Sequence, residues 1–201
     1  VVQLDRGDYW QCAYVVAKGG AEALKARGIE AFRRGVGAAA PELADVVDTL
    51  TDWDQIKLLS VALDRLERWS RPGLLAIGDA AHAMSPVGGV GINLAIQDAV
   101  AAANILAAPM ARGEPVDALL PKIEQRRMLP VRVTQAAQKA VHDRLLKPLL
   151  ESKAVIDVVP FPLRLFDWFP VLRRIPARLV GFGIRREHVR SPDATQLSPE
   201  D

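Results

Sequence analysis

The chain has 201 residues, and its 26 basic and 24 acidic side chains leave a formal net charge of +2. The length suffices for one ordinary domain or a small pair, and the nearly balanced charge gives no reason to expect nucleic acid as a partner. A single cysteine, Cys12, excludes an internal disulfide, and no cysteine–histidine cluster has the spacing of a metal site. Because no signal peptide opens the chain either, we expect a cytoplasmic protein without a bound metal ion.

The first 17 residues have the pattern of a β-hairpin, with a turn at residues 5–8 between two apolar runs. Strand alternation places Trp10, Cys12 and Tyr14 on one face of the second strand. Packing in an ordinary sheet core explains the two aromatic side chains more readily than contact with a ligand does.

The next segments predict a mixture of helices and one strand. Residues 21–36 combine helix-forming residues with a basic face, which predicts a single amphipathic helix, and residues 41–50 predict a shorter one. Residues 57–63 have the composition of a strand, and residues 70–73, Ser-Arg-Pro-Gly, predict a turn.

The most informative stretch begins with four apolar residues, 74–77, followed by Gly78 and Asp79. An apolar run closed by Gly-Asp predicts a buried strand that ends where open α/β sheets hold their ligands. The alanine- and leucine-rich residues after Asn93 predict a helix. The glycine-rich segment between them is therefore predicted to connect a strand to a helix.

This connection has a chemistry of its own. The Asp79 carboxylate is an acceptor suited to sugar or ribityl hydroxyls, and a helix that begins near Gly91 directs free N–H groups and a partial positive charge at a ligand. Gly88, Gly89 and Gly91 allow a ligand to approach the backbone closely. A flat, electron-rich ring that becomes anionic would suit this site, whereas the plain alternative is a tight turn into a well-packed helix.

Beyond residue 108, prolines and a glycine at 109–115 are predicted to break the helix, and residues 116–150 resume helical periodicity with an interruption at Pro130. Leu119, Ile123, Leu129 and Val133 form the predicted apolar stripe. The aromatic, proline-rich residues 160–170 and the short basic helix after them suit a membrane surface or docking on the protein's own body or on a subunit partner. The prolines argue against one long amphipathic helix and so favour docking.

The motif of this chain resembles the second flavin-binding motif of the para-hydroxybenzoate hydroxylase family, the single-component FAD monooxygenases. The family pattern is Gly-Asp-Ala-Ala-His, then Pro, Gly-x-Gly-x-Asn and a later Asp, and it matches residues 78–82, Pro86, residues 89–93 and Asp98. The resemblance implies that Asp79 binds the ribityl chain and that the backbone of residues 91–93 faces N1 and O2 of the isoalloxazine. The implied cofactor-binding residues are Gly78, Asp79, Pro86, Gly89, Gly91, Ile92 and Asn93.

The resemblance also implies a reaction. It is hydroxylation of an aromatic or other electron-rich small molecule through a flavin hydroperoxide, with FAD as cofactor, NAD(P)H as co-substrate and O2. Because the cofactor supplies this chemistry, no catalytic side chain is expected. Trp10, Cys12 and Tyr14 would line the substrate pocket. The alternatives are a flavin-dependent reductase or halogenase of the same fold, and a non-catalytic fragment or interaction module that does not bind flavin tightly.

The expected fold class is α/β, as a mixed α+β fragment that forms the carboxyl-terminal half of an FAD-binding monooxygenase. No strand followed by Gly-x-Gly-x-x-Gly precedes the motif, so the amino-terminal dinucleotide-binding βαβ unit is expected to be lacking. The expected regions are 1–72, the remainder of the substrate-binding domain, 73–112, the flavin-binding strand, loop and helix, and 113–201, the helical region and tail. A homo-oligomer is possible, and a membrane is not the expected partner.

Overall fold

The computed structural model describes residues 1–17, 19–86, 88–147 and 168–192. The chain divides into two compact units, one built mainly from Val1–Ser60 and the other from Val61–Leu145 with the carboxyl-terminal residues. Both units mix helices with short strands, so the mixed helix and strand class is confirmed. The three regions predicted from the sequence remain predictions.

The hairpin at the start of the first unit is confirmed. Strand β1, Val2–Asp5, pairs antiparallel with β2, Trp10–Ala13, and the register sets Val2 opposite Ala13. Gly7 forms the turn with a φ of 88°, and its N–H donates to Asp5 Oδ1 over 2.8 Å.

The helix predicted over residues 21–36 is two helices, α1 at Gly20–Ala26 and α2 at Ile29–Ala39. They are separated because Gly28 adopts a φ of 85°, which no helix residue can have. The helix predicted over residues 41–50 is also wrong, since that segment forms two 3-10 turns, Pro41–Leu43 and Val47–Thr49. A third 3-10 turn follows at Trp53–Gln55.

Three aromatic rings organise the core of the first unit. Phe32 is buried on α2, and its ring centroid lies 5.7 Å from that of Tyr14 and 5.6 Å from that of Trp53. Tyr14 thus packs against helices rather than within a sheet core. The Tyr14–Phe32 pair is edge-on, and a contact of this kind adds about 0.5–1.5 kcal/mol to the burial of the rings.

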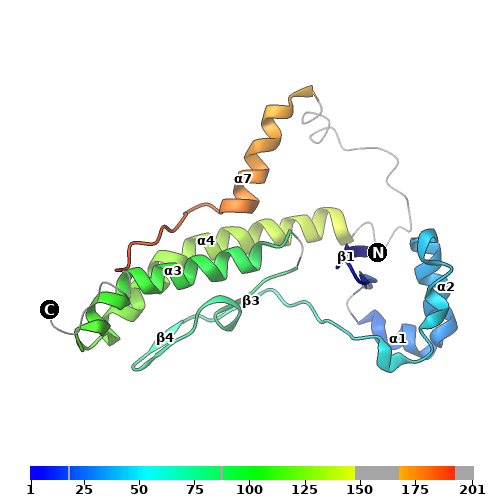
Figure 1. Ribbon diagram of the computed structural model, residues 1–201, viewed down its shortest axis with the longest axis horizontal. Helices are drawn as coiled ribbons and strands as arrows, with labels where there is room; N and C mark the ends of the chain where they lie inside the picture. Colours follow the sequence, from blue (N-terminus) through cyan, green and yellow to red (C-terminus); the bar gives the residue numbers. More distant parts are fainter. Residues whose placement is uncertain (18, 87, 148–167, 193–201) are drawn as a thin grey trace. The chain divides into compact units, whose positions relative to one another are not determined.

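Two long helices dominate the second unit: α3, Val90–Ala111, lies beside α4, Leu120–Val141 (Figure 1). Helix α3 continues through Pro109 and α4 continues through Pro130, although the sequence predicts a break at each of these prolines. Pro109 stands in the last turn of α3, and Pro130 is fully buried, so packing offsets the lost hydrogen bond. The 3-10 turn Asp117–Leu119 precedes α4, and a π-helical turn, His142–Leu146, follows it.

Near the carboxyl terminus, a 3-10 turn at Pro170–Arg173 leads into α7, Arg174–Phe182, which confirms the predicted short basic helix. Most of the aromatic stretch predicted at residues 160–170 lies outside the described residues.

Short antiparallel strands lie against the two long helices. Strand β3, Asp64–Arg65, pairs with β6, His82–Ala83, and β4, Ser70–Arg71, pairs with β5, Leu74–Leu75. The 3-10 turn Gly78–Ala80, η4, lies between β5 and β6. The strand predicted at 57–63 is wrong. The buried strand predicted at 74–77 is confirmed only in part, because β5 covers Leu74–Leu75 and Leu74 is 61% exposed.

Side chains of α4 take the place of a longer sheet. Gln138 both accepts from the Ser85 backbone N–H and donates to the Ser85 carbonyl, as a neighbouring strand would. Gln135 donates to the carbonyls of Asp64 and Ala83 at the β3–β6 pair. These amides satisfy backbone groups that would otherwise need a further strand.

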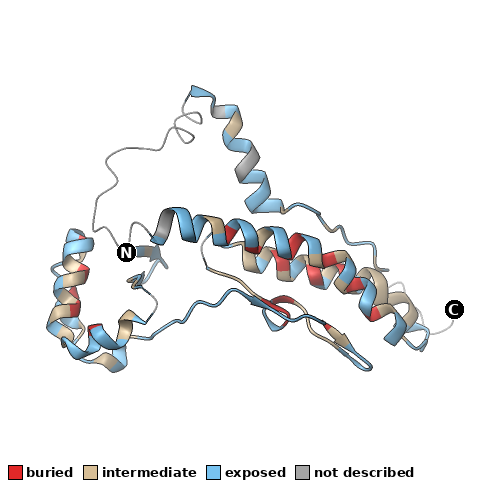
Figure 2. Cartoon of the chain, turned by 180° about the vertical axis from the view of Figure 1, so that it is seen from behind, coloured by how far each residue is buried: buried red, intermediate tan, exposed pale blue. Residues whose placement is uncertain are grey.

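The core of the second unit lies between α4 and the short strands, where Trp69, Ala81 and Val131 are buried. Figure 2 shows buried residues along both α3 and α4. The apolar stripe predicted for α4 is partly wrong, because Ile123 is buried but Leu129 and Val133 are exposed. The buried face of α4 includes polar residues, among them Arg127, and hydrophobicity alone therefore misplaces it.

Among the described residues, α3 is the one helix long and apolar enough to cross a membrane, with a mean hydropathy of 1.4. Asp98 lies in the middle of this helix and is fully buried against other parts of the second unit. Length and composition alone are weak support for a membrane span when the central residue is a paired carboxylate.

Candidate functional site

The turn at residues 78–82 fits tightly against α3. Gly78 has a φ of 58°, and a Cβ atom added to it would lie 3.0 Å from the Cβ atom of Ala95. Both the left-handed backbone and the close approach require glycine. The sequence Gly-Asp is therefore needed for the shape of the turn as well as for its chemistry.

We expect Gly78→Ala to lower the free energy of unfolding by about 2–4 kcal/mol, since it adds backbone strain to a steric clash. Gly89→Ala is the matched control, because Gly89 has a similar φ of 61° but nothing lies within 4 Å of its added Cβ. The control should lose only the strain, about 1–2 kcal/mol. Urea unfolding of both variants measures the difference, and equal losses would contradict the close packing.

The amino terminus of α3 is open. Gly89 is the N-cap residue, in the left-handed conformation, and no side chain caps the helix. Gly89 donates its own N–H to the Pro86 carbonyl over 3.1 Å, which closes the preceding turn. The helix begins at Val90, within one residue of the predicted position, so its first N–H groups and its partial positive charge are available to an anionic ligand.

Asp79 is exposed, and none of the described residues forms a hydrogen bond with its carboxylate. Pro86 and Gly89 are also exposed, and Gly91 lies in the first turn of α3, where an added Cβ would be 3.4 Å from the Cβ of Met84. Together with Gly78, these predicted residues lie in one unit, on the 78–82 turn and at the start of α3.

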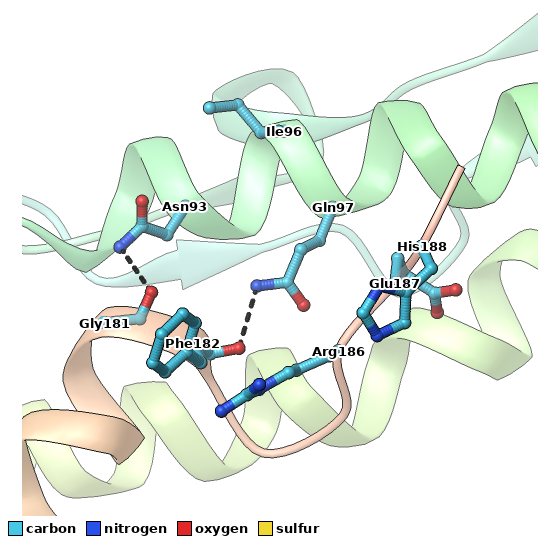
Figure 3. Close-up of a pocket in the computed structure, with 8 residues that line it drawn as sticks. All are labelled: Asn93, Ile96, Gln97, Gly181, Phe182, Arg186, Glu187 and His188. Atoms are coloured by element: carbon cyan, nitrogen blue, oxygen red, sulfur yellow. Dashed lines mark hydrogen bonds between the residues drawn. The ribbon is translucent and has the colours of Figure 1, made fainter.

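The last two predicted cofactor residues, Ile92 and Asn93, follow in α3. The Ile92 side chain is 74% exposed. Asn93 points toward the end of α7, where its amide donates to the carbonyl of Gly181 over 3.3 Å (Figure 3). The Asn93 side chain thus has a structural partner, which leaves its backbone as the part that could face a ring.

The predicted substrate residues belong to the other unit. Trp10 is 60% exposed, Cys12 is an exposed free thiol, and Tyr14 packs against Phe32. Their role toward a substrate stays a prediction.

A buried cluster of charged side chains holds the 78–82 turn to both long helices. Asp98 of α3 accepts a hydrogen bond from the Gly78 backbone N–H over 3.1 Å, and His82 Nε2 lies 2.6 Å from the same carboxylate oxygen. The other oxygen accepts from Arg127 Nε of α4 over 2.8 Å. The side chains of Asp98, His82 and Arg127 are each at most 1% exposed. One carboxylate therefore joins three separate elements.

Asp98 is ionised in this cluster. Burial alone would raise the pKa of its carboxyl group, but the hydrogen bonds from His82 and Arg127, together with that from Gly78, lower the pKa below its ordinary value of 3.8. Because a carboxylate only accepts, His82 Nε2 must carry the proton of their hydrogen bond. His82 Nδ1 is buried without a hydrogen-bond partner among the described residues.

The sequence pattern indicates no role for this cluster. Asp98 appears there only as the last position of the motif. A carboxylate inside an otherwise apolar helix was the available signal, because such a group must find a partner when it is buried. That partner, Arg127, lies 29 residues further along the chain, and only the folded structure identifies it.

The site fits the flavin cofactor that the sequence suggests. The exposed Asp79 carboxylate, which has no partner in the described part of the chain, suits ribityl hydroxyls, and the uncapped start of α3 suits the anionic edge of a reduced ring. The glycine turn at residues 88 and 89 leaves space above the backbone. These features are compatible with a flavin at this turn and at the start of α3.

The comparison with known proteins agrees with this class. Residues 6–140 match the family described as the FAD binding domain, and the chain belongs to that family. It is 34% identical over 185 residues to 6-methylpretetramide 4-monooxygenase of Streptomyces rimosus, across 92% of this chain and 43% of that protein. It is also 41% identical over 58 residues to an uncharacterized protein of Synechocystis sp., across 29% of this chain and 14% of that protein.

These matches bear on the cofactor and on the extent of the chain. Family membership supports FAD as the cofactor and fits the resemblance to the para-hydroxybenzoate hydroxylases. The chain spans less than half the length of the curated relatives it matches.

Proposed function

We propose that this chain supplies the ribityl-binding turn and the ring-facing helix terminus of an FAD-dependent monooxygenase. The substrate is an aromatic or other electron-rich small molecule, and NAD(P)H is the reductant. When bound, FAD would accept electrons from NAD(P)H and activate O2. The observation that supports this proposal best is the exposed Asp79, which has no hydrogen-bond partner among the described residues. It lies on a turn that packs against α3, and no side chain caps the amino terminus of that helix.

Each part of the site has its own task in this proposal. Asp79 accepts hydrogen bonds from ribityl hydroxyls and so fixes the cofactor along its chain. The N–H groups of the first turn of α3, at Gly91 and Ile92, offset negative charge at one edge of the ring. The open glycine turn lets the ring approach the backbone.

We further propose that residues outside this chain bind the rest of FAD, including its pyrophosphate. The sequence holds no strand followed by a Gly-x-Gly-x-x-Gly turn, which is the usual cradle of a pyrophosphate. The described residues also lack a parallel βαβ unit. We also propose that the chain is a fragment of a larger, cytoplasmic protein.

The chain by itself is expected to bind FAD much more weakly than the complete protein, and to show no NAD(P)H oxidation. Most of the ligand would lie in water, and the exposed side chains of Leu74, Ile92 and Ile96 would favour self-association. A fluorescence titration with FAD, run in parallel with size-exclusion chromatography, measures both properties. Submicromolar, stoichiometric binding by a monomer would contradict this expectation.

Two alternatives to a monooxygenase are a flavin enzyme with another reaction and a protein without catalytic activity. A reductase or halogenase would bind FAD at the same turn, and product analysis of the complete protein would distinguish it from a monooxygenase. A non-catalytic interaction module would leave the complete protein colourless, without a flavin absorbance band.

A further inference from the structure

We propose that residues 183–191, the carboxyl-terminal strap, position the flavin-binding turn through Glu187 and the two arginines of α4. This inference rests on the proposed function for its relevance to FAD, but the strap and its contacts are properties of the chain itself. Glu187 and Arg127 are positioning residues here, because they act on the turn through Asp98.

The strap completes the hydrogen bonding of Arg127. Its Nε donates a hydrogen bond to the Asp98 carboxylate, and its Nη1 donates one to the Arg185 carbonyl over 3.0 Å. Arg127 is fully buried, so a missing acceptor would leave a charged donor unsatisfied. The strap therefore helps to hold Arg127 in the orientation that reaches Asp98.

Glu187 adds the second contact. Its carboxylate accepts two hydrogen bonds from Arg126, over 2.6 and 2.8 Å, and lies 3.7 Å from Arg127 Nη1. These hydrogen bonds raise the pKa of Arg126 above its ordinary value. The Glu187 side chain is 1% exposed and Arg127 is fully buried, so water screens the attraction between these two charges little. Arg126 is 36% exposed, so its attraction to Glu187 is screened more.

The start of the strap is held by α3. Gln97 donates its amide to the Phe182 carbonyl over 3.2 Å, near the end of α7, where carbonyls lack partners within the helix (Figure 3). Further on, Asn104 accepts from the backbone N–H of Arg190 over 2.6 Å and donates to the His188 carbonyl over 2.8 Å. Contacts at both ends thus fix the strap along α3, although a pocket of about 240 Å³ remains beside it.

The contacts form one continuous path. It runs from Glu187 through Arg127 to Asp98, and from Asp98 to the Gly78 N–H and to His82. Asp79, the proposed ribityl ligand, lies between Gly78 and His82 in the same turn. A change at Glu187 should therefore alter the stability of the turn without any contact with the cofactor.

The test is hydrogen–deuterium exchange of the chain with Glu187→Gln, which keeps the shape of the side chain and removes its charge. Exchange in residues 78–82 is expected to accelerate about fivefold or more, whereas the β4–β5 hairpin should not change. Glu187→Asp, which restores the charge, should recover part of the protection. Glu114→Gln is the matched control, because Glu114 pairs with Arg112 at an exposed site and should leave residues 78–82 unaffected.

Unchanged exchange in residues 78–82, or equal acceleration in the β4–β5 hairpin, would overturn the strap as a specific positioning element. FAD affinity, measured by fluorescence titration of the complete protein with the same substitutions, should fall with Glu187→Gln and recover in part with Glu187→Asp. Accelerated exchange with unchanged affinity would overturn the coupling to the flavin. If neither the complete protein nor its variants bind FAD, the proposed function fails, while the exchange result still decides whether the strap positions the turn.

Discussion

Replacing Arg127 with methionine is expected to lower the free energy of unfolding by about 3–5 kcal/mol, the usual cost of removing one partner from a buried ion pair. Asp98 would remain fully buried and would keep only the Gly78 N–H and His82 as partners. Methionine fills much of the space of the arginine, so the loss reports the charge rather than a cavity. Urea unfolding at neutral pH measures it.

A double-mutant cycle separates the pair from its surroundings. Asp98→Asn combined with Arg127→Met removes both charges, and the double variant should lose less stability than the sum of the single variants. Arg112→Met, at an ion pair whose side chains are about half exposed, should leave the stability nearly unchanged. Additive losses at Asp98 and Arg127 would show that the two side chains do not act as a pair.

The same pair predicts a dependence on pH. Because the folded protein lowers the pKa of Asp98, its ionisation contributes stability above the ordinary value of 3.8, and this contribution is lost as the pH falls through the folded pKa. The stability difference between the wild type and Asp98→Asn should therefore shrink on acidification. A constant difference down to pH 2 would contradict an ionised Asp98.

In the complete protein, Asp79→Ala is expected to weaken FAD binding about 10- to 150-fold. The change removes a charge-assisted hydrogen bond to a ribityl hydroxyl, which contributes about 1.5–3 kcal/mol. Folding should be unaffected, because the Asp79 side chain is exposed and has no partner among the described residues. Fluorescence titration gives the affinity, and thermal unfolding without FAD confirms that the fold is intact.

Glu67→Ala is the control for Asp79→Ala. Glu67 is also an exposed carboxylate of the second unit, but it lies outside the proposed flavin site. An equal loss of affinity in both variants would indicate a general electrostatic effect, and an unchanged affinity in Asp79→Ala would exclude the ribityl role.

The elements predicted correctly from the sequence are those determined by local signals. The first hairpin follows from strand alternation around a turn at Gly7, and the start of α3 follows from the glycines before Val90. The errors arise where distant contacts override local preference. Residues 57–63 have the composition of a strand but pair with no strand among the described residues, whereas Pro130 is accommodated within α4, where it is buried.

The candidate site likewise has a part that the sequence predicts and a part that only the folded structure identifies. Residues 78–93 are contiguous, so their pattern alone indicates the turn, the carboxylate and the helix terminus. The support for the turn comes from Asp98, Arg127 and Glu187, which are far apart in the chain. Whether a buried charge has a partner depends on the packing of α3, α4 and the strap, which no local pattern encodes.

The most direct test of the proposed flavin site is an NMR titration of the 15N-labelled chain with excess FAD, which detects weak as well as tight binding. The amide signals of residues 78–82 and 90–93 should shift together along a single binding curve, and those of the β1–β2 hairpin tip should shift less. Asp79→Ala should weaken that curve. Shifts confined to other residues, or none at saturating FAD, would contradict the assignment of the turn and the start of α3 as the place where this chain binds the flavin.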